Sequence, residues 1–289
     1  MKLHLLSPDP RCLTMGCVFE TDNKHYLVID GGLDESAGSA SAGYLMEELR
    51  RITGRWRPFI DAWIFTHPHS DHINEFSRIC EQYSDVDFGV RNLYFHFPDG
   101  DFAASESEGR TTLPRFRRAV NRLFHDETAF DTYPSVRVGD TFELDGLRVE
   151  FLRVSDENLT DNPLNNSSLV FRITAEGQTY LFLGDLGAEG GDQLAAMYGE
   201  ALASDVCQMA HHGQWAVRSS LYDLIAPKIC LFFTPQWVWD NVGPDGPGTG
   251  KFEVQETLRW PAVAPARHIV TCLTGACTLE LPIPDTEAR

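Results

Sequence analysis

Four side chains that commonly bind metal ions lie within one short segment, His67-Pro68-His69-Ser70-Asp71-His72. Imidazole and carboxylate groups suit zinc and similar metals. On an extended loop His67 and His69 point to one side, and Asp71 and His72 can then face a neighbouring position. Four ligands exceed what one tetrahedral ion takes from so short a segment, so the pattern predicts two adjacent ions. The alternative is a polar turn whose histidines cap the next helix.

Three further groups follow apolar runs later and earlier in the chain. Asp185 ends the run 179–184, and a carboxylate there could bridge two cations. His211 and His212 are adjacent, so on extended chain they point in opposite directions; we favour His212 as a ligand and His211 as a substrate-side acid or oxyanion stabiliser. Asp30 precedes two glycines, and we expect it to hydrogen-bond a ligand histidine and fix its tautomer. Ordinary turn aspartates are the alternative for Asp30 and Asp185.

The elements that must position these groups are strands and helices that alternate along the whole chain. Short apolar runs rich in β-branched and aromatic residues predict strands. They are Met15–Phe19, Tyr26–Ile29, Ala62–Phe65, Leu93–Phe97, Leu147–Val154, Leu169–Ile173, Tyr180–Leu183, Asp205–Met209 and Ile229–Phe233. Segments of helical period are Ala42–Ile52, Ile73–Tyr83, Leu113–His125, Asp192–Tyr198, Ser219–Ile225 and Phe252–Leu258.

This alternation predicts one domain over residues 1–289, built from two halves of about 1–130 and 131–289, each a sheet flanked by helices. The first two strands are separated by a polar turn and should form a hairpin. Two stretches, 98–112 and 235–250, are expected to be long loops. Trp237 and Trp239 in the second either form a substrate wall or lid, or anchor the loop on the core.

The net charge of the chain is -18, from 42 acidic and 24 basic residues. So negative a surface disfavours nucleic acid as a partner, whereas metal ions in a pocket could still attract a small anionic substrate. Four arginines on one face of the helix 113–125 are explained more simply as a solvated face than as a partner surface. They are Arg115, Arg117, Arg118 and Arg122.

The seven cysteines are scattered without a Cys-x-x-Cys pair, which favours reduced, buried thiols over a disulfide framework. Pro8, Asp9 and Pro10 interrupt the first apolar run too soon for a signal peptide. No stretch approaches the roughly 18 apolar residues of a membrane-spanning helix. We therefore expect a cytoplasmic protein without a membrane partner; the sequence leaves its oligomeric state open.

Taken in order, Asp30-Gly-Gly, the His67 to His72 cluster, Gly184-Asp185 and His211-His212-Gly213 resemble the successive motifs of the metallo-β-lactamase superfamily. More narrowly, the run 165–170, Asn-Asn-Ser-Ser-Leu-Val, before Gly-Asp and His-His-Gly is similar to the soluble hydrolase domain related to the competence protein ComEC.

The resemblance implies an α/β fold of the α+β type, a four-layer αββα sandwich with two ions at one edge. It implies His67 and His69 as ligands of the first ion, with Asp185 bridging to the second. The remaining ligands of the second ion would be Asp71, His72 and His212. The cofactor implied is Zn²⁺, in two copies, with Mn²⁺ or Fe as alternatives, and the nucleophile a bridging hydroxide.

The chain departs from this family pattern in two places. Many members carry a histidine on the loop before the strand that begins at Leu169, where this chain has Asn165 and Asn166. The first site is therefore expected to be the weaker. Related domains also carry an Asn…His-Pro element late in the chain, whereas Asn241 is followed by Gly243-Pro244-Asp245-Gly246 without histidine.

Three functions follow from these patterns. The first is hydrolysis of a small phosphate ester or phosphodiester, with Asp71, His211 and Asp30 as the catalytic group beside the metals. The second is hydrolysis of a lactone, thioester or amide, since one fold supports many chemistries. The third is a metal-binding sensor or partner-binding module without turnover, which the missing histidine would suit.

Overall fold

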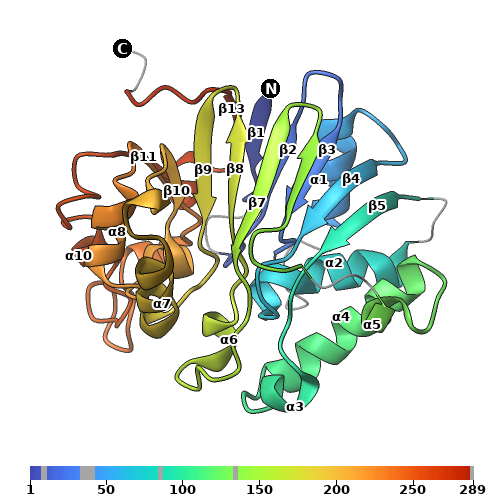
Figure 1. Ribbon diagram of the computed structural model, residues 1–289, viewed down its shortest axis with the longest axis horizontal. Helices are drawn as coiled ribbons and strands as arrows, with labels where there is room; N and C mark the ends of the chain where they lie inside the picture. Colours follow the sequence, from blue (N-terminus) through green and yellow to red (C-terminus); the bar gives the residue numbers. More distant parts are fainter. Residues whose placement is uncertain (8–11, 33–42, 84–86, 133–135, 287–289) are drawn as a thin grey trace.

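The computed structural model describes residues 1–7, 12–32, 43–83, 87–132 and 136–286. Within this part of the chain, two β-sheets face each other at the centre and helices cover their outer faces (Figure 1). The layers therefore run helices, sheet, sheet, helices, and the predicted αββα sandwich is confirmed.

The first sheet has the strand order β13-β1-β2-β3-β4-β5. β1, β2 and β3 form antiparallel pairs, including the expected β2–β3 hairpin, whereas β3, β4 and β5 run parallel. The bounds are β1 Lys2–Leu5, β2 Cys17–Glu20, β3 Tyr26–Ile29, β4 Phe59–Ile64, β5 Gly89–Tyr94 and β13 Cys277–Glu280.

The second sheet has the order β12-β11-β10-β9-β8-β7-β6. Its strands from β9 to β12 are parallel neighbours, and the remaining pairs are antiparallel. The bounds are β6 Thr141–Leu144, β7 Leu147–Arg153, β8 Val170–Ala175, β9 Gln178–Phe182, β10 Val206–Gln208, β11 Ile229–Phe232 and β12 Arg267–Val270.

Alternation along the strands divides the apolar side chains between two sides of each sheet. In the first sheet Phe19 and Ile64 point into the core between the sheets, whereas Val18 and Trp63, one residue away, join the outer core under the helices. The strand segments are apolar throughout because one face of the sheet packs against the other sheet and the opposite face packs against helices.

Three helices, α1, α2 and α4, cover the outer face of the first sheet, and α7 and α8 cover that of the second (Figure 1). The longer helices are α1 Tyr44–Thr53, α2 Ser70–Gln82, α4 Gly109–Leu123, α7 Ala188–Tyr198 and α8 Ser219–Ile225. The short ones are α3 Gly100–Ala103, α5 Ala129–Thr132, α6 Pro163–Asn166, α9 Gln236–Trp239, α10 Val254–Thr257 and α11 Thr271–Thr274, with 3₁₀ turns Gly199–Leu202 and Ala210–Gly213.

Every strand expected from the sequence overlaps a strand of the structure, but β1, β6, β12 and β13 were not predicted. Each of the expected helices also overlaps a helix, although Ala42, the expected start of the first, lies outside the described residues. β13 comes from the second half of the sequence yet pairs with β1 in the first sheet, so the two halves do not correspond fully to the two sheets.

The expectation of a long loop over 98–112 is wrong, because α3 and the first turn of α4 occupy most of it. Glycines at both helix starts obscure the helical pattern in this stretch. In the loop 235–250, α9 carries Trp237 and Trp239, which are half-buried against the outer core of the second sheet. These tryptophans therefore anchor the segment on the core.

Two expectations about the chain as a whole concern its thiols and membranes. Cys17, Cys80, Cys207, Cys230 and Cys272 are buried thiols, as expected. Among the described helices, none combines the length and the apolar character that a bilayer crossing requires.

Candidate metal centre

The chemistry-bearing segments all follow strands that end at one edge of the sandwich. β3 and β4 are parallel neighbours in the first sheet, and β9 and β10 are parallel neighbours in the second. Because parallel strands end at the same edge, the residues after them lie together. These residues are Asp30 after β3, His67 to His72 after β4, Asp185 after β9 and the His211-His212 pair after β10.

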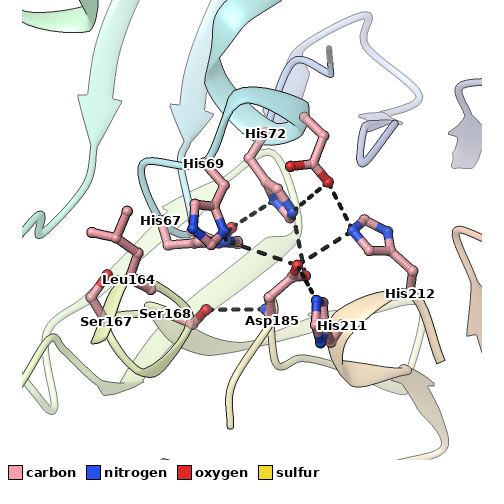
Figure 2. Close-up of polar contacts among 12 residues, drawn as sticks. His67, His69, His72, Leu164, Ser167, Ser168, Asp185, His211 and His212 are labelled. Atoms are coloured by element: carbon pink, nitrogen blue, oxygen red, sulfur yellow. Dashed lines mark hydrogen bonds and ion pairs between the residues drawn. The ribbon is translucent and has the colours of Figure 1, made fainter. Parts of the chain in front are cut away.

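Asp71, His72, Asp185 and His212 surround one position with nitrogen and oxygen atoms. Figure 2 shows His72, Asp185 and His212 pointing toward one another there. Nε2 of His212 lies 2.8 Å from Oδ2 of Asp71 and 3.3 Å from Oδ2 of Asp185. Nε2 of His72 lies 3.3 Å from Oδ1 of Asp185. One such atom from each residue lies within 4.8 Å of the others, and all four residues are buried. This spacing can accommodate one cation.

His67, His69 and Asp185 surround a second, adjacent position. Nε2 of His67 lies 3.0 Å from Nδ1 of His69 and 3.9 Å from Oδ2 of Asp185. Asp185 thus faces both positions, and its backbone N–H donates to Oγ of Ser168 at 3.0 Å, which fixes the turn that carries it. The structure therefore brings together all six residues predicted to bind metal, with Asp185 between the two groups.

Asp30 lies behind His72 and is completely buried. Its Oδ2 lies 2.8 Å from Nδ1 of His72, and its Oδ1 accepts the backbone N–H of Thr66 at 2.8 Å. The hydroxyl of Thr66 donates to Oδ2 of Asp30 as well. Asp30 contacts a histidine rather than either cation position, and it fixes that ring with Nε2 facing the cluster.

Two other histidines are oriented in the same way. Nδ1 of His212 lies 2.9 Å from the carbonyl oxygen of Phe233, and Nδ1 of His67 lies 3.1 Å from the hydroxyl of Thr66. In both rings Nε2 is the nitrogen that faces the carboxylates. Ring nitrogens that point outward are therefore engaged, and the inward ones are available to a cation.

His211 and His212 diverge for a different reason than the sequence suggested. They lie in a left-handed turn, with φ of 51° for His211 and 60° for His212, and not on extended chain. The side chain of His212 is 2% exposed, whereas that of His211 is 28% exposed and lies 3.9 Å from Oδ2 of Asp185. His212 therefore points into the cluster and His211 toward its open side.

The electrostatics of the cluster favour a positive charge at its centre. Burial alone would lower the pKa of His72, but the carboxylates of Asp185, Asp71 and Asp30 outweigh it and raise that pKa well above the usual value. For His212, burial again lowers the pKa, but the carboxylates of Asp185 and Asp71 outweigh it and raise the pKa to about 10. Protons on these two rings offset the buried carboxylates, which a divalent cation could do instead.

Unsatisfied atoms provide the test of whether a metal fits. Among the described residues, Oδ2 of Asp71, Nε2 of His72, Oδ1 of Asp185 and Nε2 of His212 are buried and lack a hydrogen bond of acceptable geometry. Buried polar atoms without partners are rare and call for an ion or another explanation. Here they converge on one position, and mixed nitrogen and oxygen donors suit a divalent metal ion.

The two asparagines at the place of the family's histidine have different surroundings. Oδ1 of Asn166 accepts the backbone N–H groups of Gly187 and Gly190, each at 3.1 Å, and its Nδ2 donates to the carbonyl of Asp161. Its amide thus holds the turn after Asp185. Asn165 is 3% exposed, and its Oδ1 has no hydrogen-bond partner among the described residues. Of the two asparagines, Asn165 is therefore the one whose amide oxygen is still free to accept a hydrogen bond.

Asn241, the residue of the late element that lacks a histidine, has a structural role. Its Oδ1 accepts the backbone N–H of Phe252 at 2.9 Å, and its own backbone is left-handed, with φ of 49°. The side chain therefore closes the loop 241–252.

Sequence reasoning missed two residues beside the cluster. Thr66 contacts Asp30, His67 and His72, and its position directly before the first histidine could have suggested this role. Glu106, whose Oε2 lies 3.5 Å from Nε2 of His69, comes from the segment expected to be a loop. Nothing in its sequence context indicates a contact with His69.

A family model and curated proteins match parts of this chain. The family model described as the metallo-beta-lactamase superfamily matches residues 17–229. The competence protein ComA of Neisseria gonorrhoeae is 36% identical over 91 residues, which are 31% of this chain and 13% of that protein. ComE operon protein 3 of Bacillus subtilis is 24% identical over 162 residues, 56% of this chain and 18% of that protein. The chain thus corresponds to a small part of these relatives.

Solved structures share the fold at low sequence identity. The metallo-beta-lactamase fold protein YhfI from Bacillus subtilis has a TM-score of 0.54 at 14% identity, over 96% of this chain and 99% of that one. Zn²⁺-bound PqqB from Methylobacterium extorquens has a TM-score of 0.53 at 14% identity, over 97% and 100%. At so low a sequence identity, the likeness shows a shared fold alone.

Proposed function

The chain belongs to the metallo-beta-lactamase superfamily, and we propose that it is a hydrolase that uses two metal ions to cleave a small phosphate ester or phosphodiester. The observation that carries this proposal is the pair of adjacent ligand groups that share Asp185. Paired cations suit phosphoryl transfer because the two ions can contact the attacking and the leaving oxygen together.

Zinc is the ion we propose, with manganese or iron as alternatives, because the two positions together have four histidines and two carboxylates. His67, His69 and Asp185 would hold one ion, and Asp71, His72, Asp185 and His212 the other. When bound, the ions would polarise the phosphoryl group and lower the pKa of water. The remaining steps belong to side chains of the protein.

His211 is the group that we propose to contact the substrate. It flanks Asp185 and keeps part of its ring exposed, so its Nε2 can donate to an oxygen of the substrate or protonate the leaving group. Burial lowers the pKa of His211, although Asp185 opposes this effect. Asp30 acts from behind, because it holds the ring of His72 through Nδ1.

Three considerations favour a small phosphoester over other substrates. The motifs resemble those of the ComEC-related hydrolase domain, and the curated relatives are a competence protein and a ComE operon protein. The net charge of -18 opposes long polyanions. A small anion needs only the local positive field of the ions.

The test is an activity screen of the wild type beside Asp71→Ala, each loaded separately with zinc, manganese or iron. The substrates are bis-p-nitrophenyl phosphate, p-nitrophenyl phosphate, a lactone and a thioester. We expect the wild type to cleave a phosphate substrate and Asp71→Ala to fall to the background rate. Cleavage of the lactone or thioester alone would overturn the substrate class. Equal activity of both proteins would exclude this site, and absence of both metal and turnover would favour a binding module.

A further inference from the structure

Glu106 connects the two halves of the fold beside the first cation position. It lies in the turn between α3 and α4, in the first half of the chain. Its Oε2 lies 3.5 Å from Nε2 of His69, and its Oε1 accepts the backbone N–H of Leu164 at 2.9 Å. Leu164 belongs to α6, the loop helix that holds asparagines where the family often has a histidine. One carboxylate thus contacts both a predicted ligand and the loop that lacks one.

The side of His69 that Glu106 contacts determines its effect. Nδ1 of His69 faces His67, at 3.0 Å from its Nε2, so the cation position lies on the Nδ1 side of the ring. Glu106 lies at the opposite nitrogen. An outward ring nitrogen held by a carboxylate keeps the proton away from the inward one and makes it a better ligand.

The turn that carries Glu106 is fixed on both sides. Toward the metal loop, the hydroxyl of Thr112 donates to the carbonyl of Pro68 at 2.6 Å, and Oε1 of Glu108 accepts the backbone N–H of Ser70 at 2.6 Å. Toward the second half, Leu164 packs in a small apolar cluster with Ala103 and Leu113. Figure 2 shows Leu164 on the side of the site where His67 and His69 lie.

The other histidines show that an outward partner is the rule in this site. His72 has Asp30, His212 has the carbonyl of Phe233, and His67 has the hydroxyl of Thr66. His69 would otherwise be the exception, and its side chain is the most exposed of the four, at 13%. Its orientation therefore depends most on a single partner.

We propose that Glu106 is the positioning residue of His69, and that it maintains the affinity of the first cation position in a site without the family's additional histidine. This inference rests on the proposed two-metal function. It assigns no contact with substrate to Glu106. Its effect acts through the orientation of His69, so it should be selective for one ion.

A calorimetric titration of metal-free protein with zinc tests this inference without an activity measurement. The proteins are wild type, Glu106→Gln and His67→Ala, which removes a ligand of the first position and so identifies its signal. Glutamine has a single acceptor oxygen, so it cannot serve His69 and Leu164 together. His67→Ala should abolish one of the two zinc-binding events. We expect Glu106→Gln to weaken that same event by about 10- to 100-fold and to leave the second zinc-binding event unchanged.

Glu157→Ala is the control for loss of a side-chain hydrogen bond that holds this segment. Oε1 of Glu157 accepts the backbone N–H of Asp99 at 2.6 Å, so it holds the same segment at its other end, away from His69. We expect this variant to bind zinc as the wild type does, with melting temperatures recorded for all four proteins. Unchanged zinc binding in Glu106→Gln overturns the inference, as does an equal loss of both ions or the same loss in Glu157→Ala. A wild type that binds no zinc overturns the two-metal function itself, and the inference with it.

Discussion

Oδ2 of Asp30 lies 2.8 Å from Nδ1 of His72, and this contact links the end of β3 to the first turn of α2. Both side chains are fully buried. Because the same carboxylate also accepts two hydrogen bonds from Thr66, its position is set by the fold and not by a bound ion. The ring of His72 is thus oriented before any metal arrives.

Replacement of Asp30 by asparagine should weaken zinc binding by about 10- to 100-fold, because the amide cannot accept from both Thr66 and His72. Calorimetric titration of metal-free protein measures this effect. Asp61→Asn is the matched control, since Asp61 is a buried carboxylate of the same sheet that accepts from Tyr26, away from the site. Equal zinc affinities of Asp30→Asn and wild type would show that Asp30 does not orient the ligand.

Replacement of the two adjacent histidines should separate binding from turnover. His212→Ala removes a buried ligand, so bound zinc per protein should fall. His211→Ala removes a partly exposed group that is not needed to complete either ligand group, so zinc content should stay while kcat falls about 10²- to 10⁴-fold. Elemental analysis beside phosphoester kinetics checks both results. Loss of zinc from His211→Ala would contradict this division of roles.

Gly213 supports the left-handed turn of the two histidines, and alanine there should destabilise the fold. Its φ is +84°, and an added Cβ would lie 2.4 Å from Cδ1 of Phe232. Gly177→Ala is the control, because Gly177 has φ of +74° but no atom within 4 Å of the added Cβ. Both variants should lose about 1–2 kcal/mol of folding stability from the backbone, and Gly213→Ala should lose a further ~1–3 kcal/mol from overpacking. Urea unfolding measures the difference; equal losses would mean that Phe232 yields without cost.

The buried pair of His4 and Glu20, remote from the metal centre, should make stability depend on pH. Burial lowers the pKa of His4 below its usual value, although Glu20 opposes this. The unfolded chain therefore takes up the proton first as pH falls through about 6.5, and the folded state loses stability until His4 is protonated as well. The free energy of unfolding should fall less between pH 7.5 and 5.5 in His4→Gln than in wild type. Parallel curves for the two proteins would count against this linkage.

The cluster at His67 to His72 could be predicted because its ligands are nearly contiguous. Asp185 and His212 could be predicted because each lies within a few residues of the end of an apolar strand. In these cases the geometry is local: a strand delivers whatever comes next to its end. The reason given for the divergence of His211 and His212 was wrong, because the two residues form a left-handed turn. This turn contacts Phe233 and Thr234, just after strand β11, and the local sequence does not reveal these contacts.

Glu106 could not be predicted for the same physical reason. Its place beside His69 is set by the packing of the α3–α4 turn on Leu164, a residue far along the chain. The strands β1 and β13 were missed because each is four residues long and neither is apolar throughout. Their pairing is recognisable only once both are placed in one sheet.

This pairing of β1 with β13 has a consequence for the order of events in folding. Lys2 and Glu280 are partners in register, so β1 acquires its second neighbour only after residues 277–280 have been synthesised. Until then β1 offers an open edge to any other extended segment. Closing so long a loop is also slow. We therefore expect the nascent chain to pass through a stage in which the metal-ligand loops after β3 and β4 exist but the sheet behind them is incomplete.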